Sequence, residues 1–512
     1  MAWSKYQNDI FDYALNNNGS FTIKAVAGSG KTTTLVECAK RISISNPKLK
    51  ILFLAFNKMI VDKLKEETAG MNINCKTLHG FGMAALCKSG LKFKLNEKKW
   101  ATYMNKKVFT LLGAEYHPLG KKDILPYKLN CLKLFDMCRI NLVKSGDFER
   151  IQEIAGTYGI IGIANEVQAV SKMLKLSTNL VMFKSKEGFE IDYIDMITLP
   201  LTETYRQFVY KYDIVFIDEA QDLSLAQQEL MQLAVAPNGK FISAGDPAQS
   251  ITAFAGTLMN SYDRLSKLAG KELPLSVNYR CGRNIVDLAK TIVPEITACE
   301  TAEDGQIVHQ KHLKNAEYGD MVICRKTAPL IELVLKYMID GDKTAFVKGN
   351  DIAEDIRNLI IKVGGDDNSF GLQSLYDKLE AYREKIYDKL MNGDVTISIQ
   401  SYHNIVDKIR CIHLIGERCF SVSDIFAMID KIFADRENGD AIVMSTIHKA
   451  KGLEADNVFI VCPELLPFVY DKQQEWEFEQ EMNLKYVAIT RAKKNLYFVD
   501  VDESKVSEIE IN

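Results

Sequence analysis

Nine consecutive residues, Ala25–Thr33 (AVAGSGKTT), combine small residues, a lysine and hydroxyl groups in a pattern that suits phosphate binding. Gly28 and Gly30 allow the backbone to turn its N–H groups toward an anion that sits at a helix N-terminus. Lys31 can reach the β- and γ-phosphates of a nucleotide, and the Thr32 hydroxyl can ligate Mg²⁺. The strict form of this pattern begins with glycine, whereas this segment begins with alanine. A Gly/Ser loop that merely ends in Lys-Thr would look similar, so the surrounding elements decide.

The flanking segments fit the strand, loop and helix order that a phosphate-binding P-loop requires. Residues 19–26 carry a turn signal and a β-rich run, and residues 34–42 have apolar positions at helical spacing. Further apolar runs of strand length, typical of buried parallel strands, occupy residues 50–56, 212–217 and 240–244. Polar residues follow these runs, at the edge where doubly wound sheets bind ligands. We therefore expect an α/β fold.

An acidic pair, Asp218 and Glu219, directly follows the apolar run 212–217. Asp218 would hold the Mg²⁺ together with Thr32, and Glu219 would orient and deprotonate an attacking water. A carboxylate pair after a strand can be only a turn. Because this pair follows a P-loop at a domain-scale distance, a Walker B arrangement is the favoured interpretation.

Another polar segment, residues 245–256, follows the apolar run 240–244. Gln249 in this segment offers an amide for a γ-phosphate, and Phe254 offers an aromatic ring for a nucleic-acid base. Phe254 could equally pack in an ordinary core. The segment is thus a candidate link between a nucleotide site and a nucleic-acid site.

The 512-residue chain has the composition of an ordinary soluble protein, and its length predicts three or four domains. A formal net charge of −3 provides no global basic field, so nucleic-acid binding would have to come from a local groove. The 11 cysteines include no CxxC pair, which favours reduced thiols over a disulfide framework or a zinc site. The start of the chain does not resemble a signal peptide, and no apolar run reaches membrane-spanning length. We expect a cytoplasmic protein without a membrane partner.

Two stretches interrupt the strand-rich pattern and are interpreted as mainly helical insertions. The first is rich in lysine, and its lysines either face nucleic acid or simply solvate helix faces. The predicted division is a first domain at 1–90 and 194–270, its insertion at 91–193, a second domain at 271–351 and 438–512, and its insertion at 352–437.

The order of the motifs resembles that of the UvrD/Rep group of superfamily 1 DNA helicases, end to end apart from the two insertions. Each motif alone is unspecific, whereas the ordered set is highly specific. The matches are Gln7, AGSGKT at 27–32, LAFNK at 54–58, TLHGF at 77–81, IDEAQD at 217–222, GDPAQSI at 245–251, NYR at 278–280, TIHKAKGLE at 446–454 and YVAITRA at 486–492.

The resemblance implies two RecA-like P-loop NTPase domains that bind ATP and Mg²⁺. It implies that Gln7 reads the adenine edge, that Tyr279 stacks on the base and that Glu454 contacts the sugar. The loop residues that would contact the nucleotide are Ala25, Val26, Ala27, Gly28, Ser29, Gly30, Lys31, Thr32 and Thr33. The family often has an arginine at the position of Thr33, so this chain departs from the pattern for adenine packing.

The resemblance also implies the catalytic residues. Lys31 and Glu219 keep the roles given above, and Gln249 would couple the γ-phosphate to the DNA track. Arg280 and Arg491 would reach across from the second domain as arginine fingers. With the P-loop on one side of a cleft and the arginines on the other, ATP would close the cleft and hydrolysis would open it.

Single-stranded DNA is the implied partner, with bases stacked on aromatic side chains in a polar groove. Some family residues are replaced: Thr252 and the pair Phe254-Ala255 leave one stacking aromatic in place of two, Ala455 follows Glu454, and the second insertion is shorter. The matching DNA-contact positions are Phe56, Asn57, Lys58, Thr77, His79, Phe254, Thr446 and His448.

The expected function is that of a DNA-dependent ATPase and helicase that translocates on single-stranded DNA, with 3′-to-5′ polarity by resemblance. It would act on single-strand/duplex junctions in replication, repair or recombination, alongside proteins of those pathways, as a monomer or weak dimer. The cytoplasm of a bacterium or of a virus-infected cell is the expected location. We expect no fused nuclease, because the chain ends soon after its last predicted strand.

Two alternatives remain at this stage. One is a single-strand-dependent ATPase that displaces proteins from DNA with little unwinding, an alternative that the shortened second insertion and the single stacking aromatic leave open. The other is a binding or regulatory protein with a degenerate ATP site. Intact residues at the phosphate and arginine positions, namely Lys31, Glu219, Arg280 and Arg491, argue against the latter.

Overall fold

A computed structural model describes residues 3–55, 58–112, 125–157, 160, 164–251, 260–340, 343–364, 371–391, 399–433, 441–471 and 473–511. The chain forms two compact units. The first contains Met1–Val26 and Gly30–Ser276, and the second contains Ala27–Ser29 and Val277–Asn512. Among the described residues, no helix combines the length and the apolar composition needed to span a membrane.

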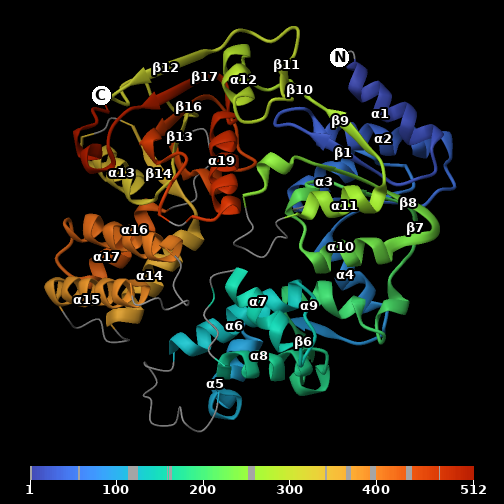
Figure 1. Ribbon diagram of the computed structural model, residues 1–512, viewed down its shortest axis with the longest axis horizontal. Helices are drawn as coiled ribbons and strands as arrows, with labels where there is room; N and C mark the ends of the chain where they lie inside the picture. The colour runs from blue at the N-terminus through green and yellow to red at the C-terminus, as the bar shows by residue number, and fades with distance from the viewer. Residues whose placement is uncertain are drawn as a thin grey trace. The chain divides into compact units, whose positions relative to one another are not determined.

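The first unit contains a six-stranded sheet in the order β3-β2-β7-β8-β1-β9, and every neighbouring pair of strands is parallel. Figure 1 labels β1, β7, β8 and β9 of this sheet. The bounds are β1 Phe21–Ala25, β2 Ile51–Ala55, β3 Ile73–Thr77, β7 Tyr212–Ile217, β8 Val235–Gly245 and β9 Glu272–Leu275. A parallel sheet with helices on both faces is the α/β class that the sequence predicts, and the prediction is confirmed.

Strand β2 shows why these strands are nearly continuous apolar runs. Successive side chains of a strand point to opposite faces of the sheet. Ile51, Phe53 and Ala55 pack in the cluster that α1 and α2 cover, whereas Leu52 and Leu54 pack in the cluster that α4 and α10 cover. The helices around this sheet are α1 Lys5–Asn16, α2 Lys31–Ser45, α3 Lys58–Glu67, α4 Leu78–Cys87, α10 Leu225–Ala234 and α11 Ser261–Ala269.

Between α4 and β7 the chain forms a separate helical cluster with its own core around Trp100 and Phe135. Its helices are α5 Lys99–Leu112, α6 Leu125–Ile140, α7 Phe148–Thr157 and α8 Ala164–Ser177, followed by α9 Tyr193–Thr198. The same region contains a three-stranded sheet that the helical periodicity does not reveal. Its order is β4-β6-β5, with β4 Phe93–Leu95, β5 Lys184–Ser185 and β6 Gly188–Ile191.

The second unit also contains a six-stranded sheet, in the order β12-β17-β16-β13-β15-β14, and its neighbouring strands are again all parallel. The bounds are β12 Gln306–Gln310, β13 Met321–Cys324, β14 Ala345–Lys348, β15 Ile442–Thr446, β16 Ala455–Val461 and β17 Ala492–Val499. The short parallel pair β10 Val277–Asn278 and β11 Thr297–Ala298 precedes it.

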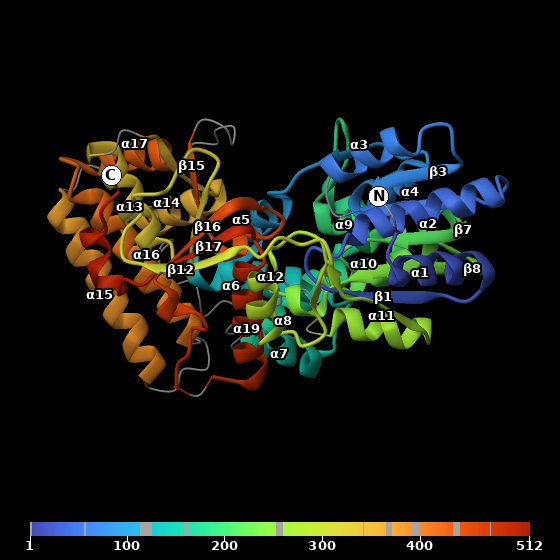
Figure 2. The same ribbon diagram turned by 90° about the horizontal axis from the view of Figure 1, so that it is seen from above.

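Helices α14 to α17 gather beside α13 of the second unit (Figure 2). Buried residues of these helices, such as Leu375, Ile412 and Ile429, belong to the same apolar cluster as Val322 and Ile442 of the sheet. The helices of this unit are α12 Arg283–Lys290, α13 Ala328–Asp340, α14 Asn350–Gly364, α15 Leu372–Met391, α16 Ile399–Gly416, α17 Val422–Ile432, α18 Ile447–Ala450 and α19 Glu475–Ile489.

Strand β9 differs from the predicted domain division, which places residues from 271 onward in the second domain. In the structure β9 pairs with β1, in the register Ile23↔Leu273, so it completes the sheet of the first unit. The physical reason is that a short edge strand carries no local signal for its partner. Its neighbour lies about 250 residues earlier in the chain, and only tertiary pairing reveals it.

Candidate nucleotide-binding site

The predicted P-loop joins the end of β1 to the start of α2. Gly28 has a φ of 65° and Gly30 a φ of 78°, both in the left-handed region that side chains with a Cβ rarely adopt. Gly30 is also the N-cap residue of α2, a helix of 15 residues. The unpaired N–H groups at this helix start, together with the helix dipole, favour an anion. The backbone thus has the form that a phosphate requires.

Four side chains from two distant segments meet beside this loop. Glu219 lies 188 residues after Lys31, and Asp218 lies 186 residues after Thr32. Lys31 Nζ lies 2.9 Å from Glu219 Oε2, and the Thr32 hydroxyl donates a hydrogen bond to Asp218 Oδ2. The structure therefore brings together the four residues that the sequence predicts for phosphate, Mg²⁺ and water.

Glu219 has an unusual backbone. Its φ of 54° and ψ of 47° place a non-glycine residue in the left-handed region, directly after β7. Such a conformation costs on the order of 1–3 kcal/mol and clusters at functional sites. The Glu219 N–H donates to Asp218 Oδ1 at 3.0 Å, which helps to hold the turn. With this turn, both consecutive carboxylates contact the start of α2, Asp218 at Thr32 and Glu219 at Lys31.

The electrostatics of this site leave negative charge in excess. Burial, together with the neighbouring Glu219 carboxylate, raises the pKa of Asp218 to about 6. Burial likewise raises the pKa of Asp246 to about 6. Burial alone would lower the Lys31 pKa, but Glu219, Asp246 and Asp218 together raise it above its ordinary value. Among the described residues, no group of three or more His, Cys, Asp or Glu side chains has the arrangement of a metal site. The Asp218 carboxylate and the Thr32 hydroxyl are nevertheless adjacent oxygen ligands of the kind that Mg²⁺ takes.

Two further residues in this network have no role in the sequence prediction. Gln221 donates from Nε2 to Glu219 Oε2 at 2.6 Å, and its Oε1 accepts from the Asp246 N–H at 3.1 Å. Asp246 Oδ2 in turn accepts from Gln249 Nε2 at 2.6 Å. The network connects the acidic pair to Gln249 on the loop after β8. Gln221 and Asp246 lie within the predicted motifs IDEAQD and GDPAQSI. The spacing of polar residues inside these motifs was the sequence signal that could have identified them.

Gln7, the predicted adenine reader, is buried at the start of α1. Its backbone N–H and its Oε1 form a reciprocal capping pair with Ser4, and its Nε2 donates to Thr34 Oγ1 at 3.2 Å. Thr33, which replaces the family's arginine, is exposed on α2. The structure therefore holds Gln7 next to the first turn of the P-loop helix.

The second unit brings together its own predicted nucleotide residues. Arg280 Nε lies 2.6 Å from Glu454 Oε2, and Arg280 Nη1 donates to Thr490 O at 3.2 Å. Arg491 is 1% exposed and donates from Nε to Val487 O at 2.9 Å. Its Nη1 donates to Leu453 O at 3.1 Å. Tyr279 presents an exposed ring. The roles of both arginines at a γ-phosphate stay predictions.

The predicted DNA-contact residues of the first unit lie at the carboxyl ends of β2 and β3. Lys58 begins α3 and is exposed. Thr77 caps α4 by accepting from the Gly80 N–H at 3.0 Å. His79 is half-buried, which lowers its pKa, and its ring lies 5.7 Å from that of Tyr193. Three further predicted positions, Phe56, Asn57 and Phe254, lie outside the described residues.

In the second unit, Thr446 is the last residue of β15 and His448 follows the strand. Thr446 is the N-cap residue of α18 and is 7% exposed. Burial, together with Arg325 and Lys449, lowers the pKa of His448 to about 3. The candidate DNA contacts of each unit therefore lie at the carboxyl edge of its sheet.

Comparison with known families decides the assignment. A model of the UvrD/REP helicase N-terminal domain matches residues 7–269, just over half of the chain. The chain belongs to the UvrD/REP helicase family. A model of the UvrD-like helicase C-terminal domain matches residues 371–503. The resemblance that the ordered motifs predict is thereby confirmed.

Individual relatives in this family are distant. The chain is 22% identical to the F-box DNA helicase protein 1 of Schizosaccharomyces pombe, over 96% of this chain and 57% of that protein. It is 25% identical to the F-box DNA helicase 1 of Gallus gallus, over 96% and 48% respectively. It is 20% identical to a probable DNA helicase II homolog of Mycoplasma pneumoniae, over 93% and 81%. The chain thus spans about half the length of the two F-box relatives.

Proposed function

We propose that this UvrD/REP family member is a DNA-dependent ATPase that translocates on single-stranded DNA and couples ATP hydrolysis to strand separation. The observation that carries the proposal is the cluster of Lys31, Thr32, Asp218 and Glu219 at the P-loop. Family membership supplies DNA as the substrate class. The 3′-to-5′ polarity and a place in replication, repair or recombination are parts of the proposal that rest on family likeness.

The residues present fit ATP with Mg²⁺. The N–H groups of the P-loop and the Lys31 ammonium would hold the phosphates, and Thr32 and Asp218 would hold the metal. The chemistry that Mg²⁺ supplies when bound is neutralisation of charge on phosphate oxygens. The excess of carboxylates around Lys31 is the feature of this chain that favours a bound cation.

The Lys31–Glu219 ion pair suggests how phosphate binding prepares hydrolysis. A phosphate is an alternative anionic partner for the Lys31 ammonium, so it competes with Glu219. Once released from Lys31, the Glu219 carboxylate can accept a proton from water, which is the general-base role. Gln221 still donates to Glu219 at 2.6 Å and would keep the carboxylate oriented.

The link to DNA is proposed to run through Gln249. Its amide is held by Asp246, which belongs to the same hydrogen-bonded network as Glu219. A change at the loop after β8 can therefore reach the general base through Asp246, by its carboxylate and its backbone N–H, and then through the Gln221 side chain. Arg280 and Arg491 are proposed to complete the site from the second unit as arginine fingers.

Assays of ATP turnover and strand displacement on 3′-tailed, 5′-tailed and blunt duplexes test this function. We expect DNA-stimulated turnover, with displacement of the strand only on the 3′-tailed substrate. Displacement only on the 5′-tailed substrate would reverse the polarity. An ATP turnover rate that is the same with and without DNA would contradict the proposal that the protein is a translocase.

A second candidate is an ATPase that removes proteins from single-stranded DNA with little unwinding. The arrangement of α14 to α17 favours it, because these helices share the core of the second sheet instead of forming a core of their own. Release of streptavidin from a biotinylated oligonucleotide, compared with unwinding of the 3′-tailed duplex, separates the two candidates. Fast release without unwinding would support the second.

A further inference from the structure

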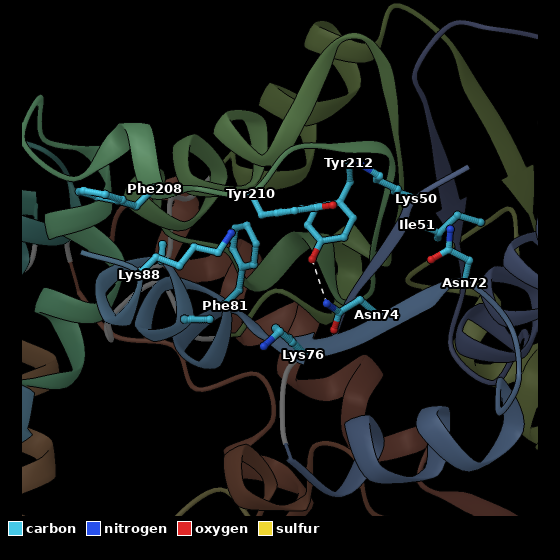
Figure 3. Close-up of a pocket in the computed structure, with 12 residues that line it drawn as sticks. Lys50, Ile51, Asn72, Asn74, Lys76, Phe81, Lys88, Phe208, Tyr210 and Tyr212 are labelled. Carbon is cyan, nitrogen blue, oxygen red and sulfur yellow. Dashed lines mark hydrogen bonds between the residues drawn. The ribbon is translucent and has the colours of Figure 1, made fainter. Parts of the chain in front are cut away.

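A pocket of about 320 Å³ lies in the first unit, apart from the P-loop (Figure 3). One face of edge strand β3 forms its floor, α4 borders it, and the segment before β7 closes it. Lys50 precedes β2 and Asn72 precedes β3, so the pocket reaches the amino ends of the strands. Lys31 and Asp218, in contrast, follow the carboxyl ends of their strands. The pocket is therefore separate from the nucleotide site.

The charge of the pocket is positive. Lys50, Lys76 and Lys88 line it, and none of its lining residues is acidic. Within the part of the chain that the structure describes, none of these three ammonium groups forms an ion pair with a carboxylate. Asp213 lies close by and accepts from the Lys50 backbone N–H at 2.8 Å. The pKa of the Lys50 ammonium is raised, chiefly by its hydrogen bond with the Tyr210 hydroxyl and also by the Asp213 carboxylate. In a chain of net charge −3, three such lysines in one hollow form a local site for an anion.

The wall of the pocket is aromatic. Tyr210 is 40% exposed, and its ring lies 4.9 Å from that of Tyr212, which is buried and lies 6.2 Å from the ring of Phe81. The ammonium groups of Lys88 and Lys50 lie 4.5 and 5.3 Å from the centre of the Tyr210 ring. Figure 3 shows the Lys88 side chain extended toward this ring. Exposed aromatic rings among lysines are the usual platform for nucleic-acid bases next to a phosphate backbone.

An amide completes the set of groups. Asn74 donates from Nδ2 to the Tyr212 hydroxyl at 2.9 Å, as the dashed line in Figure 3 marks. Among the described residues, its Oδ1 has no hydrogen-bond donor, so this acceptor remains available to a ligand. Amide oxygens beside an aromatic ring accept hydrogen bonds from the exocyclic amines of bases.

We propose that this pocket binds one nucleotide, with its base against Tyr210, a base amine donating to Asn74 and its phosphate among the three lysines. The volume is at the lower end of the range for small-ligand pockets, which suits a single nucleotide. An acidic peptide would satisfy the lysines but would leave the ring and the amide without a function. The nucleotide could belong to a DNA strand or be free in solution. The proposal goes beyond the proposed function, since it requires no ATP hydrolysis.

Photochemical crosslinking of the full chain with an oligonucleotide that contains 5-iodocytosine, which keeps the exocyclic amine, tests the proposal. We expect crosslinks at Tyr210, or at Tyr212, and Lys211 between them places the two tyrosines on different tryptic peptides. Crosslinks in the predicted DNA track would map to other peptides. ATP turnover measured on the same samples reports on the proposed function independently, so the two proposals can fail separately.

Variants sharpen the test. Replacing Lys50, Lys76 and Lys88 together by alanine should lower the crosslink yield at the tyrosines by about tenfold at moderate salt, because phosphate contacts dominate such binding. The matched control replaces three exposed lysines that make no ion pair with a described residue, Lys186, Lys267 and Lys290. Its yield should stay near the wild-type value. Tyr210→Ala, judged by the crosslink that remains at Tyr212, tests the stacking platform without a change of charge.

Competition identifies the source of the nucleotide. Loss of the crosslink with unlabelled oligonucleotide but not with deoxycytidine monophosphate indicates a DNA strand, and loss with both indicates a free nucleotide; either result supports the proposal. Equal competition by poly-glutamate would show a site for charge alone and would overturn it. Absence of crosslinks at both tyrosines of the wild-type chain, or equal yields in the two lysine variants, would also overturn it.

Discussion

At the scale of single residues, Lys31 has one positive charge against three carboxylates, and this balance determines what each substitution should do. Removing Lys31 takes away the group that is proposed to contact the phosphates and leaves the carboxylates uncompensated. Removing the charge of Glu219 instead relieves repulsion between the carboxylates while eliminating the proposed proton acceptor. The two changes should therefore affect binding and hydrolysis differently.

We expect Lys31→Ala to abolish ATP turnover and to weaken nucleotide binding strongly. Glu219→Gln should keep nucleotide binding largely intact while stopping hydrolysis, because an amide cannot take the proton of the attacking water. Binding of a fluorescent ATP analogue and phosphate release measure the two effects. Glu203→Gln, which changes an exposed glutamate, is the matched control. Wild-type turnover in Glu219→Gln would show that another group is the base.

Gln221 was not assigned a role from the sequence, and its hydrogen bond to Glu219 gives it a testable one. Gln221→Leu removes this donor while keeping a similar size. Hydrogen bonds to charged groups contribute about 1.5–3 kcal/mol, which corresponds to a loss of about 10- to 100-fold in kcat. KM for ATP should change much less. A proportional rise in KM at unchanged kcat would indicate a role in binding instead.

At the scale of elements, a buried ion network joins the inserted helices to α9. Lys99 of α5 pairs with Asp195, and Arg139 of α6 lies 2.8 Å from Asp192 and 3.0 Å from Asp195. Asp192 is also the N-cap of α9 and forms a reciprocal capping pair with Asp195. Burial and the adjacent Asp192 raise the pKa of Asp195, so the two cations are needed to keep it ionised.

Arg139→Ala should destabilise the first unit by about 3–5 kcal/mol, because it leaves a buried carboxylate without its partner. The measurement is the midpoint of thermal unfolding, together with the rate of proteolysis within residues 125–198. Arg150→Ala breaks an exposed pair with Glu153 and should have little effect. Equal midpoints of thermal unfolding for the two variants would mean that the ion network around Arg139 is exposed to water in solution.

The elements also show which parts of the fold are predictable from sequence. The P-loop and the apolar strands β2 and β7 have local signals, namely glycines at positive φ and continuous hydrophobic runs, and the structure contains them. The small sheet β4-β6-β5 and the edge strand β9 have no such signal, because their partners are distant and their strands are short. Within the site, motif order predicted the cluster around Lys31, whereas the bridge through Gln221 depends on tertiary contacts.

At the scale of the whole molecule, the proposal requires residues of both units to act on one nucleotide. Arg280→Ala and Arg491→Ala should each reduce DNA-stimulated turnover by about 10³- to 10⁵-fold if they serve as arginine fingers, while ATP binding weakens much less. Turnover of each variant, with folding checked by circular dichroism, is the measurement. Lys493→Ala, which removes another cation paired with Glu454, is the control. A loss below about tenfold in both arginine variants would be well short of a finger's contribution and would contradict the two-unit ATP site.

ATP turnover should depend on single-stranded DNA, because the segment that follows β8 carries both Gln249 and the predicted base contact Phe254. Turnover with and without a poly-thymidine oligonucleotide is the direct measurement. Gln249→Ala should retain basal turnover better than stimulated turnover, since its proposed role is to transmit the presence of DNA. Equal ATP turnover with and without the oligonucleotide would show that DNA binding is not coupled to the nucleotide site.

The parallel pairing in both sheets also constrains how the chain folds as it is synthesised. In the first sheet Phe21 is paired with Ile242, and Ile23 with Leu273, so β1 has to wait for strands made more than 200 residues later. In the second sheet Gln306 is paired with Asn495. The inserted helices α5 to α8, which have their own core, can pack while β1 still lacks β8 and β9 and while β2 still lacks β7. On a ribosome, the apolar faces of β1 and β2 would stay exposed during that interval, which is when the nascent chain most needs chaperones.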